Sequence, residues 1–368
     1  MLSTNQLRYT LALQRVNNLG DTSAKKLIQI VGSAEGIFKE KRSNLLKIDG
    51  IGSFKIKGLD DASLLDQADE ELRFISDNNI SISYFQDKTY PEKLKHCVDG
   101  PLLFFHSGNI DIQRKTLISV VGTRNITSYG RAQCEKLIAD LAPFDPVIIS
   151  GFAYGVDITA HQAAVQHKLQ TIACLAHGLN QIYPKVHKKY VSQMEAHGGF
   201  ISEFWSDDPF DRTNFLKRNR IIAGISEATI VIESAAKGGS LVTADIANSY
   251  NRDVFAMPGR VTDSQSEGCN NLIKTQQAHL LSSAADLIYL LGWNLKDQKV
   301  KALQTQLFIA LSEEEKPIYE FLRTTEKEVL DNIALHCKIP THKAATLLLG
   351  MELKGAIRPL PGKLFQAI

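Results

Sequence analysis

The 368-residue chain is 44% apolar and 22% charged, a globular composition with room for two or three domains. Its formal net charge of only +2 excludes a global field that draws the whole protein to nucleic acid or to a membrane, so any anion site must come from local clustering. The five cysteines form no Cys-x-x-Cys pair, and no apolar stretch approaches the ~18 residues that span a bilayer. We therefore expect a protein of the reducing cytoplasm, with no structural metal, no disulfide framework and no membrane partner.

Residues 1–75 are predicted to form short helices joined by glycine turns. The turn at residues 46–52 has the hydrophobic-x-Gly-hydrophobic-Gly form of a helix-hairpin-helix motif, in which outward backbone N–H groups can hold a phosphate. Tight turns within a small helical bundle are the alternative, and the nearby acids Asp49, Asp60 and Asp61 favour it. We expect a helix-hairpin-helix or SAM-like domain, and its contact with DNA stays open.

Residues 78–292 alternate apolar, β-branched runs with helical stretches, which predicts an α/β domain built on a Rossmann-like, doubly wound parallel sheet. Ligands of such sheets bind beyond the carboxyl ends of the strands, so the residues that follow each strand are the candidates for function. The predicted strands are residues 117–121, 147–150, 171–175, 200–202, 228–232 and 254–257.

The last quarter of the chain is predicted to hold a linker at residues 293–311 and a winged-helix domain at residues 312–368. Ser312 is a suitable helix N-cap, two further helices are expected at residues 326–336 and 341–354, and the end reads as a β-hairpin. The last of these helices carries one lysine and is mostly apolar, which favours a docking or auxiliary role over a firm grip on DNA.

Three of the predicted strand ends have the features of anion sites. The first strand leads into Gly122 and Arg124, a close-approach glycine followed by a guanidinium fork that suits two phosphate oxygens. The segment Lys237-Gly238-Gly239-Ser240 precedes a helix, where backbone N–H groups can cradle a phosphate. The chain contains neither a Walker A loop nor a Gly-x-Gly-x-x-Gly fingerprint, so we predict no ATPase, no nicotinamide chemistry and no cofactor.

The small-residue turn at residues 150–155 is a third candidate, because its glycines and the N-terminus of the helix that it opens could cradle a phosphate. That helix carries Asp157 and His161 on one face. A catalytic or metal-binding pair is one reading of these two residues. A buried pair that braces the loop is the reading we favour, because no third metal ligand lies at a suitable spacing. We predict no catalytic residue and no metal.

Residues 212–220 place four cations and one aromatic ring in nine positions without an acid. On a helix, Phe215, Arg218 and Asn219 share one side. This places a ring that can stack on a base beside side chains that can donate hydrogen bonds to phosphates. A solvated basic face is the alternative, but the apolar residues 221–223 that follow predict a helix packed into the domain. The cations of this segment are Arg212, Lys217, Arg218 and Arg220.

Together these segments resemble the DNA-processing protein A family, also called DprA or Smf. The matching stretches lie in the family's order over about residues 90–290, and they are VVGTRN, SGFAYGVDITAH, GLNQIYP, GGFISEF, FLKRNRIIAGIS, KGGSLVTADIA, VFAMPG and GCNNLI. The resemblance implies a non-enzymatic protein that binds single-stranded DNA during natural transformation, protects it and loads the recombinase RecA on it. It also implies a homodimer formed through the Rossmann-like domains.

The resemblance also implies which residues hold the DNA. The phosphate pocket would contain Arg124, Gly151, Lys237, Gly239 and Ser240, and Gly238 departs from the serine expected there. The basic rim would contain Arg212, Phe215, Lys217, Arg218, Asn219 and Arg220. Phe215, with Phe152 or Tyr154, would stack on bases while the cations neutralise phosphates and release counterions.

Two other functions compete with this interpretation. A nucleoside monophosphate phosphoribohydrolase would use Glu233 and the loop at residues 237–240, but such enzymes need a glutamate soon after the glycines, and Thr243, Ala244 and Asp245 stand there instead. A scaffold that binds RecA and no DNA would have no use for the basic run at residues 212–220.

Overall fold

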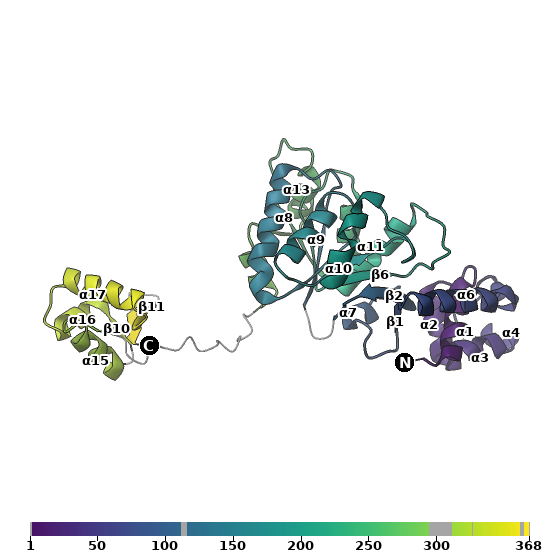
Figure 1. Cartoon of the computed structure of the whole chain (residues 1–368), viewed down its shortest axis with the longest axis horizontal. Helices are drawn as coiled ribbons and strands as arrows, with labels where there is room; N and C mark the ends of the chain where they lie inside the picture. Colours follow the sequence, from purple (N-terminus) through teal and green to yellow (C-terminus); the bar gives the residue numbers. More distant parts are fainter. Residues whose placement is uncertain (1, 112–115, 294–310, 326, 361–363, 368) are drawn as a thin grey trace. The chain divides into compact units, whose positions relative to one another are not determined.

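The computed structural model describes residues 2–111, 116–293, 311–325, 327–360 and 364–367, in two compact units that end and begin at residues 295 and 296 (Figure 1). The α/β class with a mostly parallel sheet is confirmed. In the described part of the first unit, one nine-stranded sheet has the order β1-β2-β6-β5-β4-β3-β7-β8-β9. Every neighbouring pair is parallel except β1 with β2 and β2 with β6.

The six predicted strands are present to within two residues at either end. Their residues are almost all buried, because a central parallel strand is covered on both faces and β-branched and aliphatic side chains fill that space. Three strands were not predicted: the two edge strands β1 (Ser81–Tyr84) and β9 (His279–Leu280), and β2 (Leu103–Gly108), which lies between β1 and β6. The predicted strands are β3 (Leu117–Val121), β4 (Val147–Ser150), β5 (Thr171–Cys174), β6 (Gly198–Ser202), β7 (Ala228–Val231) and β8 (Asp253–Ala256).

Helices cover both faces of this sheet. The core on one face joins the sheet to α8 (Ser128–Leu141), α9 (Val156–Gln166) and α14 (Ala284–Leu290). The core on the other face joins it to α11 (Asn214–Ile225), α12 (Gly239–Ser249) and α13 (Glu267–Lys274). The shorter elements are α7 (Glu92–Lys95), η2 (Ala142–Phe144), η3 (Lys185–Tyr190) and α10 (Val191–Ala196).

The strand order places a topological switch between β3 and β7. From β3 the chain adds β4, β5 and β6 on one side, and it then returns to add β7 and β8 on the other side. The connections from β3 and from β7 therefore leave the sheet in opposite directions, which opens a crevice at the carboxyl ends of these two strands.

The N-terminal helices share one apolar core with β1, β2 and Trp205, so they pack on the antiparallel edge of the sheet (Figure 1). The glycine turn at residues 46–52 precedes α5, which is only four residues long, and Lys55 donates to the Gly50 carbonyl oxygen at 2.8 Å. The helices are α1 (Thr4–Arg15), α2 (Asp21–Val31), α3 (Ala34–Lys39), α4 (Arg42–Leu45), α5 (Ser53–Ile56), η1 (Lys57–Asp60) and α6 (Ser63–Asp77).

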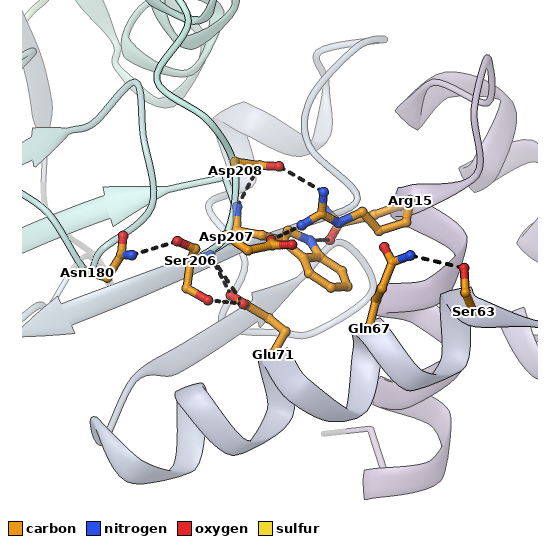
Figure 2. A network of polar contacts seen from close by, with 10 residues as sticks. Arg15, Ser63, Gln67, Glu71, Asn180, Ser206, Asp207 and Asp208 are labelled. Carbon is orange, nitrogen blue, oxygen red and sulfur yellow. Dashed lines mark hydrogen bonds and ion pairs between the residues drawn. The ribbon is translucent and has the colours of Figure 1, made fainter.

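A polar network fastens the segment between β6 and α11 to these helices (Figure 2). The Ser206 backbone N–H donates to both Glu71 carboxylate oxygens at 3.2 Å, and its hydroxyl donates to the same carboxylate at 2.5 Å. Arg15 forms ion pairs with Asp207 and, at 2.9 Å, with Asp208. Burial raises the pKa of the Glu71 carboxyl, against the effect of the Ser206 hydrogen bonds.

Asn180 and two residues of α1 also hold the segment between β6 and α11. The Asn180 side-chain amide donates to the Ser206 carbonyl oxygen at 2.6 Å. The Arg15 guanidinium lies 4.3 Å from the Trp205 ring centroid, and the Trp205 indole N–H donates to Gln14 at 3.1 Å. This anchoring fixes the start of the connection that delivers Phe210 and Arg212 to the carboxyl edge of the sheet.

The second unit contains three helices and a three-stranded antiparallel sheet of order β10-β12-β11 in its described residues. Ser312 and Glu315 exchange hydrogen bonds between side chain and backbone N–H, at 2.7 and 3.3 Å, just before the first helix. Strand β10 was not predicted, and most of the predicted linker lies outside the described residues. The elements are α15 (Lys316–Thr325), β10 (Glu328–Val329), α16 (Leu330–His336), α17 (Thr341–Leu353), β11 (Ile357–Leu360) and β12 (Leu364–Ala367).

None of the helices in the described ranges combines the length and the apolar character that a membrane span requires.

We predict that Glu71→Ala lowers the free energy of unfolding by about 1–3 kcal/mol, because it leaves the Ser206 N–H and hydroxyl without their acceptor in a poorly hydrated place. Urea denaturation followed by circular dichroism measures the change. Glu70→Ala, which alters the exposed neighbour on α6, is the matched control. Equal stability of the two variants would contradict the anchoring role.

Candidate functional site

A hollow of about 560 Å³ lies at the switch point, beyond the carboxyl ends of β3 and β7. Segments far apart in the sequence line it: the loop after β3, Ala153 before α9 with Asp157 at its start, Tyr183, α11 with the segment before it, and the loop that opens α12. Eight of the residues predicted from the sequence lie in its wall. They are Arg124, Arg212, Phe215, Arg218, Asn219, Lys237, Gly239 and Ser240.

The loop after β3 is pressed against the elements beneath it. A Cβ atom on Gly122 would lie 2.4 Å from Val156 Cγ2 and 2.9 Å from the Glu233 carbonyl oxygen, so only glycine fits there. The Thr123 N–H donates to that carbonyl oxygen at 2.8 Å, and the Val156 N–H donates to the Thr123 carbonyl oxygen at 3.1 Å. The N-terminus of α9 is therefore occupied by the chain itself, and the predicted cradle at residues 150–155 lies under this loop.

The Glu233 carboxylate holds the start of α8. It accepts hydrogen bonds from the Thr127 N–H at 2.8 Å and from the Thr127 hydroxyl at 2.5 Å, and it is buried. A Cβ atom on Gly130 would lie 2.3 Å from this carboxylate, so the two segments are in close contact. Glu233 is not among the described residues that line the hollow, and Thr127 occupies its carboxylate oxygens. Both facts disfavour the alternative in which Glu233 serves a nucleoside monophosphate phosphoribohydrolase.

The Arg218 side chain is a buried brace. Its guanidinium donates to the Gly151 carbonyl oxygen at 2.7 Å and to the Cys174 carbonyl oxygen, at the ends of β4 and β5. A Cβ atom on Gly151 would lie 2.6 Å from both terminal nitrogens of Arg218 and from Asp157 Oδ2, so Gly151 is required for this packing. Burial lowers the pKa of Arg218 and raises that of Asp157, and each charge partly offsets the effect on the other.

Three cations face the hollow without a carboxylate partner among the residues that the structure describes. They are Arg124, Arg212 and Lys237, which come from three different segments and are exposed. Asp157 is the one acid in the described wall, and it is buried beneath Arg218. The rim of the hollow is therefore positively charged even though the chain as a whole is nearly neutral.

Helix α12 directs its first turn at the same hollow. No side chain of the described residues caps its N-terminus, where Gly238 has extended backbone angles and Gly239 begins the helix. The Ser240 hydroxyl donates to the Ser234 hydroxyl at 3.0 Å, and the Leu241 N–H donates to the Gly238 carbonyl oxygen at 3.1 Å. The Gly239 and Ser240 N–H groups and the positive end of the helix dipole therefore remain for an anion within the described structure. A Cβ atom on Gly239 would meet no protein atom within 4 Å, so the space in front of it is open.

Three aromatic rings stand between the cations. The Phe215 ring centroid lies 5.9 Å from that of Tyr183 and 5.7 Å from that of Phe210, and the last two are 4.8 Å apart. The Arg124 guanidinium lies 5.3 Å from the Phe215 ring centroid. Tyr183 is 41% exposed and Phe210 is 44% exposed, so both rings offer a face to a ligand.

Tyr183 and Phe210 were not predicted as site residues. Tyr183 lies within the GLNQIYP stretch quoted for the family resemblance, which was the one available signal. Phe210 lies in an irregular segment, where no periodicity marks the direction of its side chain.

Several predicted site residues lie elsewhere. Phe152 is fully buried, with its ring centroid 5.2 Å from that of Phe200, so it is part of the core and cannot stack on a base. Arg220 forms ion pairs with Asp21, at 3.1 Å, and with Glu203, because a residue two positions beyond Arg218 lies on another side of the helix.

Lys217 lies beside Arg220 in the wall of a separate hollow toward the N-terminal helices. Tyr154, the other predicted stacking ring, has its centroid 5.1 Å from that of His187 and is not part of the described wall.

Asp157 and His161 do not bond to one another in the described structure. Asp157 accepts from the Ala153 N–H at 3.2 Å, which braces the loop. His161 Nδ1 contacts the Thr171 hydroxyl at 2.7 Å, and burial lowers the pKa of His161 to about 3. No group of three metal-ligating side chains occurs among the described residues.

We predict that Arg218→Ala destabilises the fold as well as the site, because it removes two hydrogen bonds to buried carbonyl oxygens, each worth about 1–3 kcal/mol when left unmade. Thermal unfolding should show a clearly lower midpoint for Arg218→Ala and an unchanged midpoint for Arg124→Ala. Equal midpoints would show that the Arg218 guanidinium is free to bind a ligand instead.

The family described as DNA recombination-mediator protein A matches residues 81–292. The DNA processing protein DprA of Streptococcus pneumoniae is 38% identical over 202 residues, 55% of this chain and 71% of that protein. Protein Smf of Escherichia coli is 36% identical over 282 residues, 74% of each chain.

Two solved structures are similar. The crystal structure of Streptococcus pneumoniae DprA superposes with a TM-score of 0.64 and 30% identity, over 78% of this chain and 98% of that one. The structure of Helicobacter pylori DNA processing protein A, described for its single-stranded DNA binding mode, has a TM-score of 0.52 and 28% identity, over 58% of this chain and 95% of that one. The family match covers more than half of the sequence, and this chain belongs to the DNA recombination-mediator protein A family, also called DprA or Smf.

Proposed function

We propose that the chain binds single-stranded DNA in the hollow at the carboxyl edge of its sheet and acts there as a recombination mediator. The observation that carries this proposal is that three features surround one concavity: three cations without a carboxylate partner in the described part of the chain, the open first turn of α12 and an exposed aromatic cluster. A phosphate chain needs the first two features, and unpaired bases need the third. The single-stranded DNA binding of the Helicobacter pylori relative supports it.

Binding in this hollow follows from electrostatics and stacking. Arg124, Arg212 and Lys237 neutralise phosphates and release counterions, while the N–H groups of α12 hold a phosphate that comes close to Gly239. Phe215 and its neighbouring rings stack on bases, at about 1–3 kcal/mol per base, and each base type has a ring face to offer. We therefore expect slight sequence preference and a marked preference for single strands, since a duplex keeps its bases stacked inside the helix.

The finer architecture is part of the proposal. The switch between β3 and β7 and the helices on both faces support a Rossmann-like, doubly wound domain at residues 78–292. Three helices with a three-stranded antiparallel sheet support a winged helix at residues 312–368, and the N-terminal 75 residues form the helix-hairpin-helix or SAM-like domain. In α17 the Lys343 ammonium is paired with Glu314 at 2.7 Å, which supports docking rather than DNA contact.

The cellular role is proposed from the family. A protein of this family in the cytoplasm would cover incoming single-stranded DNA during natural transformation and load RecA on it. The Rossmann-like domains would pair into a homodimer, which presents two hollows to one strand and raises the overall affinity through effective concentration.

We predict that Arg124→Ala weakens binding of fluorescein-labelled oligo-dT by about tenfold or more, because it removes a charge-assisted contact worth about 1.5–3 kcal/mol. The plot of log affinity against log salt should become shallower by about 0.7 for the lost phosphate contact. Fluorescence anisotropy over a range of salt concentrations measures both quantities.

Lys168→Gln is the control for this titration, because it removes the same charge at the turn before β5, on the opposite edge of the sheet. It should bind as the wild type does. Equal affinity for single strands and duplex, or unaltered binding by Arg124→Ala, would count against the proposed site.

A further inference from the structure

A second hollow of about 580 Å³ adjoins the first, and the two share Tyr183 and Phe210 in their walls. It is lined by the GLNQIYP segment, η3 and the carboxyl end of β5, none of which supplies a cation to the first hollow. Its volume lies in the range of small-molecule sites, which is about 300–1,000 Å³. Of the GLNQIYP segment, Tyr183 is the one residue in the described wall of the first hollow.

The floor of this second hollow is apolar and firmly held. Leu175 and Phe200 form it, and both are buried in one cluster with Phe152 and Met194. The His187 ring stands edge-on to Phe152, with centroids 5.3 Å apart, and its Nδ1 contacts the Phe152 carbonyl oxygen at 2.9 Å. An apolar floor that is already packed takes a flat ring without rearrangement of the core.

The rim of the second hollow is polar and carries cations. Lys185 and Lys188, one helical turn apart on η3, are exposed and form no ion pair with a carboxylate in the described part of the chain. Gln181 adds an amide that can donate to and accept from a base edge. Glu195 is the one acid in the described lining, so two positive charges face one negative charge.

The exposed rings of Tyr183 and Phe210 form a wall that is common to both hollows. A DNA strand whose phosphates are bound in the first hollow can therefore continue along this wall into the second hollow. It stays in contact with aromatic rings and cations over the whole path. Aromatic rings that stack on bases, beside cations that bind phosphates, are the combination that binds single-stranded nucleic acid.

We propose that the second hollow is a further nucleotide subsite, which holds the nucleotides that follow along the same strand after those in the first hollow. A base lies on the apolar floor against the Tyr183 and Phe210 wall, Gln181 meets its edge, and Lys185 and Lys188 meet the adjoining phosphates. This inference rests on the proposed binding of single-stranded DNA, and it extends the footprint on each chain beyond the switch point.

The test is the dependence of affinity on oligonucleotide length, measured by fluorescence anisotropy with labelled oligo-dT from a few to about twenty nucleotides. The double variant Lys185→Ala/Lys188→Ala removes the rim cations, and Lys189→Ala is its matched control. Lys189 is exposed on the same η3 helix, but it lies over the Tyr190 ring at 5.0 Å and does not line the hollow.

The shortest oligonucleotides that bind should bind equally to the wild type and to the double variant. Longer ones should bind the double variant at least fivefold more weakly, with a salt slope shallower by about 0.7 for each lysine that neutralises a phosphate. Lys189→Ala should match the wild type at every length, whereas Arg124→Ala should weaken binding at every length.

Wild-type affinity of the double variant for long oligonucleotides, or an equal loss at all lengths, would overturn the second subsite. If the same titration shows loss in Arg124→Ala, the proposed function stands while the subsite falls. Absence of any oligonucleotide binding by the wild type would overturn both.

Discussion

The arrangement of the site depends on a buried guanidinium. Arg218 reaches from α11 to the backbone carbonyl oxygens of Gly151 and Cys174, so it ties the helix to the ends of β4 and β5. Because Phe215 is three residues earlier on α11, the same contact sets the Phe215 ring above the hollow. A buried guanidinium is costly unless its donors are satisfied and its charge is offset. Here backbone oxygens accept from the donors, and the nearby Asp157 carboxylate partly offsets the charge.

Bracing and binding are divided between different side chains of the same loops. The Glu233 carboxylate accepts a hydrogen bond from Thr127 at the start of α8, and the Arg218 guanidinium donates to the backbone at the end of β4. Both side chains therefore stabilise the fold rather than bind a ligand. Arg124, Arg212 and Lys237 are left with their charges unpaired by carboxylates in the described residues. Preorganised loops let such exposed cations meet a phosphate chain at a smaller entropic cost than loops that must first become ordered. A nearly neutral protein can in this way build a local anion site.

The sequence predicts the central sheet well because a parallel strand is buried on both faces and must be apolar throughout. It misses β2, an antiparallel strand between β1 and β6 whose last residues are partly exposed, and β9, which is two residues long. The helical period correctly places Phe215 with Arg218. It does not tell that Arg218 is a brace or that Arg220 pairs with Asp21, because these contacts join segments far apart in the chain. Phe210 lies in an irregular loop, where side-chain direction is set by tertiary contacts such as those of Ser206.

The most direct measurement of whether a phosphate chain occupies this hollow compares Gly239→Glu with Gly239→Gln. A side chain at Gly239 meets no protein atom nearby, and an acid in the first turn of α12 is favourable for the helix, so neither variant should lose stability. The glutamate would put a negative charge where the phosphate is expected, and the glutamine tests the effect of bulk alone. We predict that anisotropy titration with oligo-dT shows a far larger loss of affinity for Gly239→Glu than for Gly239→Gln, with thermal midpoints no lower than that of the wild type. Wild-type affinity in both variants would contradict the account.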